Sequence, residues 1–211
     1  MYDTKKILKV DPVNPEPAII KRAVKSIKNN KIVVFPAQCI YGLAVNALNE
    51  QALKKVFKFK KRSFDKPVLI LISNKKMLKN FVRFIPKTAQ KLIKAFWPGD
   101  LTLVFDAKKK TSKVLTANTG KIGIRLAEHP VAKAIVQGLD CPITGTSANL
   151  SGERSCTNIS KISSPIIKKA DIILDAGKLK GGRSSVVDVS TKEIKMIRKG
   201  RITIDMIYKA L

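Results

Sequence analysis

A short polar stretch, Ser147 to Gly152, carries the side chains best suited to hold a ligand. It follows an apolar, β-branched run from Pro142 that is typical of a buried strand. The stretch therefore places hydroxyls, one amide and free backbone N–H groups at the carboxyl end of a strand. Open α/β sheets bind ligands there, and successive N–H groups in a tight loop can bind an anion. On these residues alone, an ordinary polar turn explains the stretch equally well.

Apolar strands alternate with amphipathic helices around this stretch, which predicts an α/β fold. The apolar runs predict strands at 31–35, 68–72, 101–105, 123–125, 172–175, 184–189 and 194–198. The helical spacing predicts a first helix that starts within 14–17 and ends at 29–30. It predicts further helices at 49–59, 75–82, 86–96, 130–138, 159–169 and 203–211, with Pro165 interrupting one of them. Residues 37–43 read as a loop. Some neighbouring strands are close enough to pair antiparallel, so we expect a twisted, open sheet of mixed parallel and antiparallel strands flanked by helices.

The composition limits the classes of protein to consider. The 211 residues, 45% of them hydrophobic, suit one globular domain spanning 1–211. No apolar run approaches the roughly 20 residues that span a bilayer, and Met1 to Leu8 has no apolar core of signal-peptide length. We therefore expect a cytoplasmic protein without membrane contact. One histidine and three cysteines without ligand spacing predict reduced thiols and no protein metal site.

The charge is strongly positive, with 42 Lys and Arg against 15 Asp and Glu, a net charge of +27. Such a balance attracts polyanions and also steers small anionic substrates. The cations are spread over nearly every segment and the aromatic content is only 6%, which argues against a base-stacking platform. A generally basic surface is thus favoured over a shaped nucleic-acid groove.

For several further residues, a structural role competes with a functional one. Tyr41 and Trp97 are expected to pack in the core rather than stack on a ligand. His129, directly before Pro130, is expected to start a helix or lie at the surface. Asp188 fits a structural acceptor as well as it fits a metal ligand.

Residues 146–152, Thr-Ser-Ala-Asn-Leu-Ser-Gly, resemble the Ser-x-Asn signature of the YrdC/TsaC family, the threonylcarbamoyl-AMP synthases. Other signatures of the family follow the same order over residues 15–202, and an ordered series is far more specific than Lys-x-Arg alone in so basic a chain. They are Val33–Ala44, Lys60-Lys61-Arg62, Asp65-Lys66-Pro67, Trp97-Pro98-Gly99, Gly123-Ile124-Arg125, Ser184–Asp188 and Ile197–Gly200.

The resemblance implies a YrdC-like fold, similar to DHBP synthase, and a nucleotidyltransferase. Such an enzyme joins L-threonine, bicarbonate and ATP into threonylcarbamoyl-AMP and releases pyrophosphate, with Mg²⁺ bridging the phosphates. A partner transferase machinery then modifies tRNA to N6-threonylcarbamoyladenosine. Positioning and cations carry most of such a transfer.

The resemblance also assigns roles to residues of this chain. The implied catalytic residues are Lys60, Arg62, Ser147 and Asn149. The implied ATP-binding residues are Arg62, Lys66, Lys121, Ser147, Ser155 and Arg198. The implied threonine-binding residues are Cys39, Arg125, Gly145 and Ser184.

The chain departs from the family pattern on the threonine side. Ala37 and Cys39 stand where members usually have two threonines, Gln38 replaces an acid, and Leu71 aligns with a common histidine. Loss of polar partners weakens a site that binds a hydroxyl. Threonine use, another amino acid and no synthesis at all therefore remain open. The alternative to a synthase is a paralogue that binds nucleotide or double-stranded RNA without making the intermediate.

Overall fold

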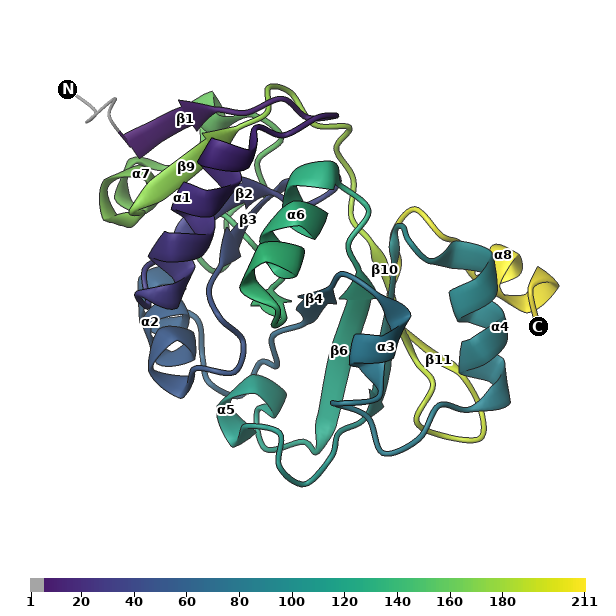
Figure 1. The fold of residues 1–211 in the computed structure, drawn as a ribbon. Coiled ribbons are helices and arrows are strands. Elements are labelled where there is room, and N and C mark those ends of the chain that lie inside the picture. Colours follow the sequence, from purple (N-terminus) through teal and green to yellow (C-terminus); the bar gives the residue numbers. More distant parts are fainter. Residues whose placement is uncertain (1–5) are drawn as a thin grey trace.

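The computed structural model describes residues 6–211. The predicted absence of a signal peptide falls mostly on residues 1–5, outside the described residues. Eleven strands form two hydrogen-bonded sheets, with helices packed around them (Figure 1). No helix within 6–211 is long and apolar enough to cross a bilayer.

The first sheet has the strand order β1-β9-β2-β3-β8. These strands are β1 (Ile7–Lys9), β9 (Ile172–Asp175), β2 (Val33–Pro36), β3 (Tyr41–Ala44) and β8 (Thr146–Ser147). Parallel pairing joins β1, β9 and β2, whereas β3 is antiparallel to both of its neighbours.

The second sheet has the order β11-β10-β5-β6-β4-β7. These strands are β11 (Lys195–Arg198), β10 (Ser185–Asp188), β5 (Leu101–Asp106), β6 (Lys121–Leu126), β4 (Ile70–Ile72) and β7 (Ile143–Thr144). The pairs β10·β5 and β4·β6 are parallel and the other pairs are antiparallel. The predicted α/β class with mixed strand directions is thus confirmed, although two sheets replace the single sheet expected.

The chain crosses from one sheet to the other at Gly145, between β7 and β8. A Cβ atom there would lie 2.2 Å from the side chain of Leu69, and the Gly145 N–H donates to the Leu69 carbonyl at 2.9 Å. A side chain at residue 145 would have to displace that of Leu69. Gly145 therefore divides the predicted strand and places Ser147 in the first sheet.

Helices cover the sheets through two clusters of buried apolar side chains. α1 (Pro17–Lys28) and α6 (Pro130–Leu139) lie side by side and pack against Val33 and Phe35 of β2 (Figure 1). α2 (Glu50–Lys60) and α4 (Lys87–Phe96) pack in the other cluster, which contains Val34. Strand β2 is thus buried on both faces, which explains its continuous apolar sequence.

Shorter helices complete the fold: α3 (Lys75–Leu78), α5 (Lys113–Thr116), α7 (Ser164–Lys169), α8 (Ile204–Lys209) and the 3-10 turn η2 (Ile159–Lys161). The interruption predicted at Pro165 is confirmed, because η2 and α7 divide that segment. His129 caps α6 by accepting from the Val131 N–H at 3.3 Å, so its predicted place at a helix start is confirmed.

Residues 37–43 are only partly the loop that we expect from the sequence, because β3 begins at Tyr41. All four residues of β3 are buried, and Gly42 lets the Phe35 ring and the Thr146 carbonyl approach to about 3 Å of where a Cβ would stand. The run is too short and too interrupted by glycine to read as a strand. Periodicity also misses β1 and α5, which have three and four residues.

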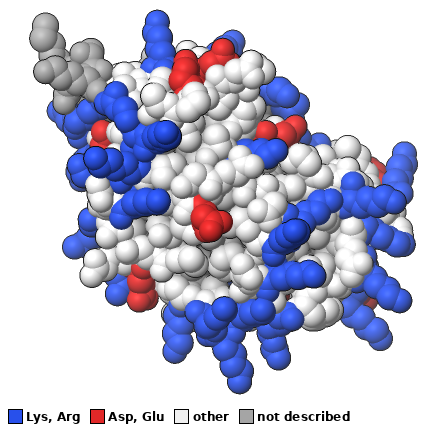
Figure 2. Space-filling view, in the orientation of Figure 1, with Lys and Arg blue, Asp and Glu red and all other residues white. Residues whose placement is uncertain are grey.

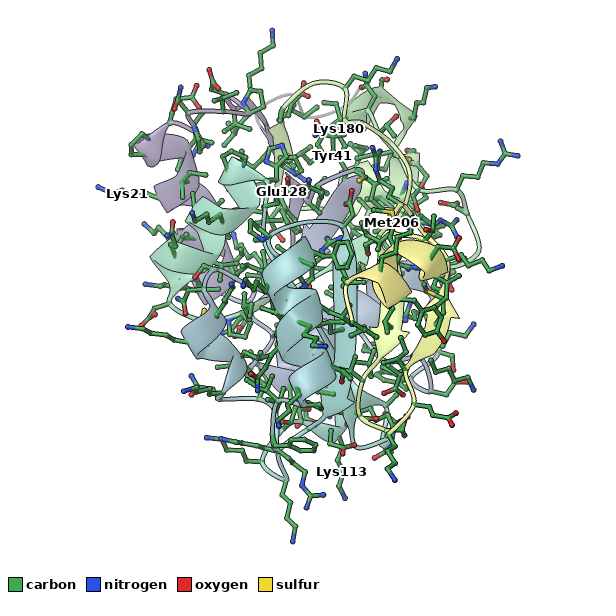
Figure 3. All side chains as sticks on the ribbon, turned by 90° about the vertical axis from the view of Figure 1, so that its right-hand side faces the viewer. Lys21, Tyr41, Lys113, Glu128, Lys180 and Met206 are labelled. Atoms are coloured by element: carbon green, nitrogen blue, oxygen red, sulfur yellow. The ribbon has the colours of Figure 1, made fainter. Side chains whose placement is uncertain are left out.

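The two aromatic residues expected to pack in the core are both buried, although Tyr41 also lines a cavity. Tyr41 is fully buried, and its hydroxyl donates to the Gly177 carbonyl at 2.7 Å. Figure 3 places Tyr41 inside the molecule, whereas Lys21 and Lys113 lie at its periphery. Trp97 is buried as well and donates through Nε1 to the Leu101 carbonyl at 2.7 Å. All three cysteines are unpaired, as expected.

Gly200 offers a test of how the segment after β11 supports the second sheet. A Cβ at Gly200 would lie 2.4–2.5 Å from backbone atoms of Arg183, Ser184 and Ser185. We predict that Gly200→Ala lowers the free energy of unfolding by about 2 kcal/mol, since backbone cannot move aside as a side chain can. Urea denaturation measures the change.

Gly138→Ala is the matched control, because its Cβ would meet only the Val24 side chain, at 3.1 Å, within a helix that favours alanine. Equal losses in the two variants would contradict the steric account of Gly200.

Candidate functional site

A cavity of about 520 Å³ lies where the two sheets meet. Its wall includes residues of β3, β5, β6, β8, β10 and β11 and of the loops beside them. All the predicted site residues except Lys60 and Lys66 line it: Arg62, Ser147, Asn149, Lys121, Ser155, Arg198, Cys39, Arg125, Gly145 and Ser184. Residues scattered from 39 to 198 in the sequence thus share one space.

Positive charge dominates this wall. Its cations are Arg62, Lys121, Arg125, Arg183 and Arg198. Among the residues that the structure describes, Glu153 is the sole carboxylate lining it. Sequence reasoning missed Arg183 and Glu153, although each directly adjoins a recognised motif. The arrangement suits a ligand with several negative charges.

Arg62 is held in place by the loop that follows α2. Its Nε donates to the Lys66 carbonyl at 3.2 Å and its Nη2 to the Pro67 carbonyl at 2.8 Å. Partial burial lowers the pKa of this guanidinium, which nevertheless stays charged. The side chain of Lys66 is exposed and lies outside the cavity wall, so Lys66 contributes its carbonyl to Arg62 in this structure.

Lys60 lies beneath the Ser147–Asn149 segment and not in the wall. Its ammonium, on a residue that is 2% exposed, donates to the carbonyls of Ser147 and Asn149 and to Asn149 Oδ1. Burial, together with the nearby charge of Arg62, lowers the pKa of Lys60 to about 8. Lys60 therefore fixes the backbone of the loop from below.

The polar loop closes on itself above Lys60. Ser147 Oγ donates to Asn149 Oδ1, and Asn149 Nδ2 donates to the Glu153 carbonyl at 2.6 Å. The Leu150 N–H donates to Glu153 Oε2 at 2.9 Å. The loop is thus a hydrogen-bonded unit that presents Ser147 and Asn149 to the cavity, which is more order than an ordinary surface turn requires.

A second group of side chains forms the wall around β10. Arg198 donates to the Ser184 carbonyl at 2.8 and 3.1 Å and to its Oγ at 3.0 Å. Lys121 pairs with Asp188 at 2.7 Å, and Asp188 also accepts from Ser190. These bonds are those of a structural acceptor, one of the two alternatives left open for Asp188.

Arg62 and Arg198 donate to backbone carbonyls and Lys121 pairs with Asp188, whereas the Arg125 side chain has no hydrogen bond or ion pair among residues 6–211. The residue is only 8% exposed, and burial lowers its pKa. A buried guanidinium without a carboxylate is costly unless an anion binds it. Arg125 is therefore the strongest candidate in the wall to hold a carboxylate of a ligand.

The altered first loop meets the cavity beside Arg125. Cys39 lines the wall and donates through its thiol to Asp100 Oδ1 at 3.1 Å. Burial, together with the adjacent Asp100, raises the pKa of Cys39 to about 11. Gln38 donates to Glu128. Leu71 is fully buried and does not line the cavity. Leu69, two residues earlier, lines the wall instead.

The profile of the family described as telomere recombination, Sua5/YciO/YrdC, matches residues 25–200. The chain belongs to the Sua5/YciO/YrdC family. The motifs that carried the resemblance to threonylcarbamoyl-AMP synthases lie within the matched region, so the predicted family is confirmed.

Relatives in the Sua5/YciO/YrdC family are named as synthases. The threonylcarbamoyl-AMP synthase of Pyrococcus abyssi is 33% identical over 91% of this chain. The match covers 57% of that relative, so this chain spans little more than half its length. The putative threonylcarbamoyl-AMP synthase of Methanocaldococcus jannaschii is also 33% identical, over 97% of each protein.

Solved structures agree with this assignment. The structure of P. abyssi Sua5 complexed with L-threonine aligns with a TM-score of 0.93 at 32% identity, covering 97% of this chain and 60% of that one. Escherichia coli YciO aligns with a TM-score of 0.87 at 21% identity and covers 95% of this chain and 98% of its own, which supports the fold.

The buried ammonium of Lys60 predicts a distinct dependence of stability on pH. Its pKa is about 8 in the folded protein and 10.5 ordinarily, so the unfolded chain binds more protons between those values. The contribution of Lys60 to the free energy of unfolding therefore rises as the pH increases from about 8 to 10.5. We predict that Lys60→Met removes this rise.

The measurement is urea denaturation of both proteins across that pH range. The difference between them isolates Lys60, because the cysteines and tyrosines titrate in both. Parallel curves for the two proteins would contradict the burial of a charged Lys60.

Proposed function

We propose that the protein is an L-threonylcarbamoyladenylate synthase that makes threonylcarbamoyl-AMP from L-threonine, bicarbonate and ATP. The observation that carries the proposal is the composition of one cavity wall. It unites the ordered Ser147–Asn149 loop, a set of cations and the unpaired guanidinium of Arg125. The names of the relatives and the complex of P. abyssi Sua5 with L-threonine support it.

ATP binds, in this proposal, along the part of the wall with the most cations. Arg62, Lys121 and Arg198 supply positive charge for the phosphates, and Ser147 and Ser155 supply hydroxyls. Arg62 is already oriented by the Lys66 and Pro67 carbonyls, so it loses little freedom when a phosphate binds. Asn149 also lines this part of the wall, on the loop to which Lys60 donates hydrogen bonds.

Threonine binds at the other end, with its carboxylate on Arg125. Ser184 lies beside it, and its hydroxyl is shared between Thr102 at 3.3 Å and Arg198 at 3.0 Å. Gly145 keeps the wall open where any side chain would meet Leu69. Cys39 lines the same wall, and in this proposal it contacts the substrate side chain.

The chemistry joins the two ends. The threonine amine forms a bond to the carbon of bicarbonate, and water is lost to give the carbamate. A carbamate oxygen then bonds to the α-phosphorus as the bond to the pyrophosphate oxygen breaks, and pyrophosphate leaves with that electron pair. Negative charge accumulates on the phosphates in this step, and preorganised cations stabilise it.

Mg²⁺ is expected to accompany the triphosphate. The residues of 6–211 contain no cluster of three potential metal ligands, and Glu153 already accepts from the Leu150 N–H. The described residues therefore offer no cage for the ion, which would be held chiefly by phosphates and water.

The product is expected to pass to a transferase machinery that modifies tRNA, in the cytoplasm. Lys and Arg side chains are spread around the visible face of the molecule (Figure 2), which favours general attraction of RNA over a defined groove. The alternative is a paralogue that binds nucleotide or double-stranded RNA without synthesis. The basic surface fits this alternative equally well, but the alternative gives Arg125 no carboxylate to bind.

The deciding experiment measures pyrophosphate release from ATP with Mg²⁺, bicarbonate and each amino acid in turn. We predict release that requires both threonine and bicarbonate. Release with a different amino acid would change the substrate. Measurable ATP binding without release under any condition would replace the synthase by the binding paralogue.

Arg125→Gln tests the threonine end separately. Loss of a charge-assisted hydrogen bond costs about 1.5–3 kcal/mol, so threonine affinity should fall roughly 10- to 100-fold. ATP affinity should not fall in step, because the phosphate-binding cations remain. Calorimetric titration with each ligand measures both.

Lys113→Gln is the control, because it removes one positive charge at the periphery (Figure 3). An equal loss of threonine affinity in this control would show a general charge effect instead of a specific contact.

A further inference from the structure

Two side chains from separate parts of the chain form a pair at the amino-acid end of the cavity. Cys39 lies between β2 and β3, and Asp100 lies directly before β5. The thiol donates to Asp100 Oδ1 at 3.1 Å. An ionised carboxylate only accepts hydrogen bonds, so the single thiol hydrogen is committed to Asp100.

Arg201 binds the carboxylate oxygen of Asp100 that does not accept from the thiol. Its Nε pairs with Asp100 Oδ2 at 3.2 Å, and its Nη1 donates to the Gly181 carbonyl at 3.2 Å. The Gly181 N–H in turn donates to the Cys39 carbonyl at 2.9 Å. Asp100 thus keeps Oδ1 for the thiol while its other oxygen is occupied.

This orientation decides what Cys39 offers to a ligand. With its hydrogen directed at Asp100, the sulfur can present only lone pairs to the cavity that it lines. Burial and the adjacent carboxylate raise the pKa of the thiol to about 11, so the hydrogen stays on sulfur at neutral pH. The wall at this point accepts a hydrogen bond and does not donate one.

Arg125 is a second, independent indication that a ligand binds at the Cys39 end of the cavity. It is 8% exposed, lines the same cavity and has no ion pair within the described residues. The carboxylate of Asp100, which binds the Cys39 thiol, opposes the lowering of the Arg125 pKa by burial, so Asp100 lies near Arg125 as well. An amino acid whose carboxylate binds Arg125 therefore has its side chain within the surroundings of Cys39.

We propose that Asp100, acting through the Cys39 thiol, makes this end of the cavity a hydrogen-bond acceptor that selects an amino acid with a side-chain hydroxyl. The proposal rests on the proposed function and deepens it. Asp100 is a positioning residue, and Cys39 contacts the substrate. The chain thereby keeps selectivity for threonine without the threonine residues usual in this loop.

The selectivity has a direct chemical probe in 2-aminobutyrate, which is threonine without its hydroxyl. This analogue leaves the sulfur without a donor, and we expect it to bind roughly tenfold more weakly than threonine. Calorimetric titration of the full chain gives the ratio of the two dissociation constants without requiring turnover. A ratio of one in the wild type would overturn the proposal.

A double-mutant cycle shows whether Asp100 acts through residue 39. Cys39→Thr places a stronger oxygen acceptor at the same site, with its hydrogen again directed at Asp100, and should raise the ratio. In the Asp100→Asn background that gain should be largely lost, because the hydroxyl is no longer oriented. The same gain in both backgrounds would overturn the role of Asp100.

Arg201→Gln is the matched control, because it removes the ion pair of Asp100 but leaves the carboxylate beside the thiol. We expect lower stability and an unchanged ratio. If Asp100→Asn fails to fold, Cys39→Ala provides the second test: without the sulfur the ratio should fall to about one, and an unchanged ratio would overturn the proposal.

The reactivity of the Cys39 thiol gives a further measurement, one that would not change if Asp100 had only a structural role. Loss of the carboxylate charge should lower the pKa of Cys39, so its alkylation by iodoacetamide at alkaline pH should be faster in Asp100→Asn than in Arg201→Gln. Mass spectrometry of the peptide containing Cys39 separates it from the other cysteines. Equal rates would contradict the hydrogen bond.

The outcomes separate this inference from the proposed function. Selective threonine binding without pyrophosphate release would refute the synthase and leave the selectivity intact. Pyrophosphate release that depends on threonine would support the synthase. If none of these substitutions then changed the ratio of the two dissociation constants, the selectivity proposed for Cys39 and Asp100 would be refuted.

Discussion

A buried ammonium on Lys60 is the interaction on which the site depends. Burying a charge costs several kcal/mol unless hydrogen bonds replace its water. Here the carbonyls of Ser147 and Asn149 and the Asn149 side chain supply those bonds. In return, the end of α2 is fixed to the loop after β8, so Arg62 and Ser147 keep a constant relation in the wall although they come from distant parts of the chain.

The excess of cations in the wall is the second constraint. Arg62, Lys121, Arg125, Arg183 and Arg198 share one cavity, and their mutual repulsion is relieved only partly by protein partners. Lys121 has Asp188 and Arg198 has the Ser184 carbonyl, whereas Arg125 lacks an ion pair within 6–211. Part of the binding free energy of an anionic ligand thus comes from removing this repulsion, a cost that functional sites commonly impose on the fold.

Much of the fold follows from local sequence, because its longer helices and strands carry clear periodicity. The boundaries of α4, α6 and β9 agree with prediction to within a residue or two. What escaped prediction is short or depends on contacts: β1, α5 and the strand that begins at Tyr41. The division into two sheets escaped as well, since it follows from the close approach of Leu69 to Gly145.

The sequence by itself determined the family and most of the side chains in the wall, because ordered motifs survive as a linear pattern. Only the tertiary structure decided what each side chain does. It places Lys60 beneath the loop and Lys66 outside the wall, and it adds Arg183 and Glu153. It also pairs Cys39 with Asp100, 61 residues away. Such pairs arise from the packing of separate strands, which leaves no periodic trace in the sequence.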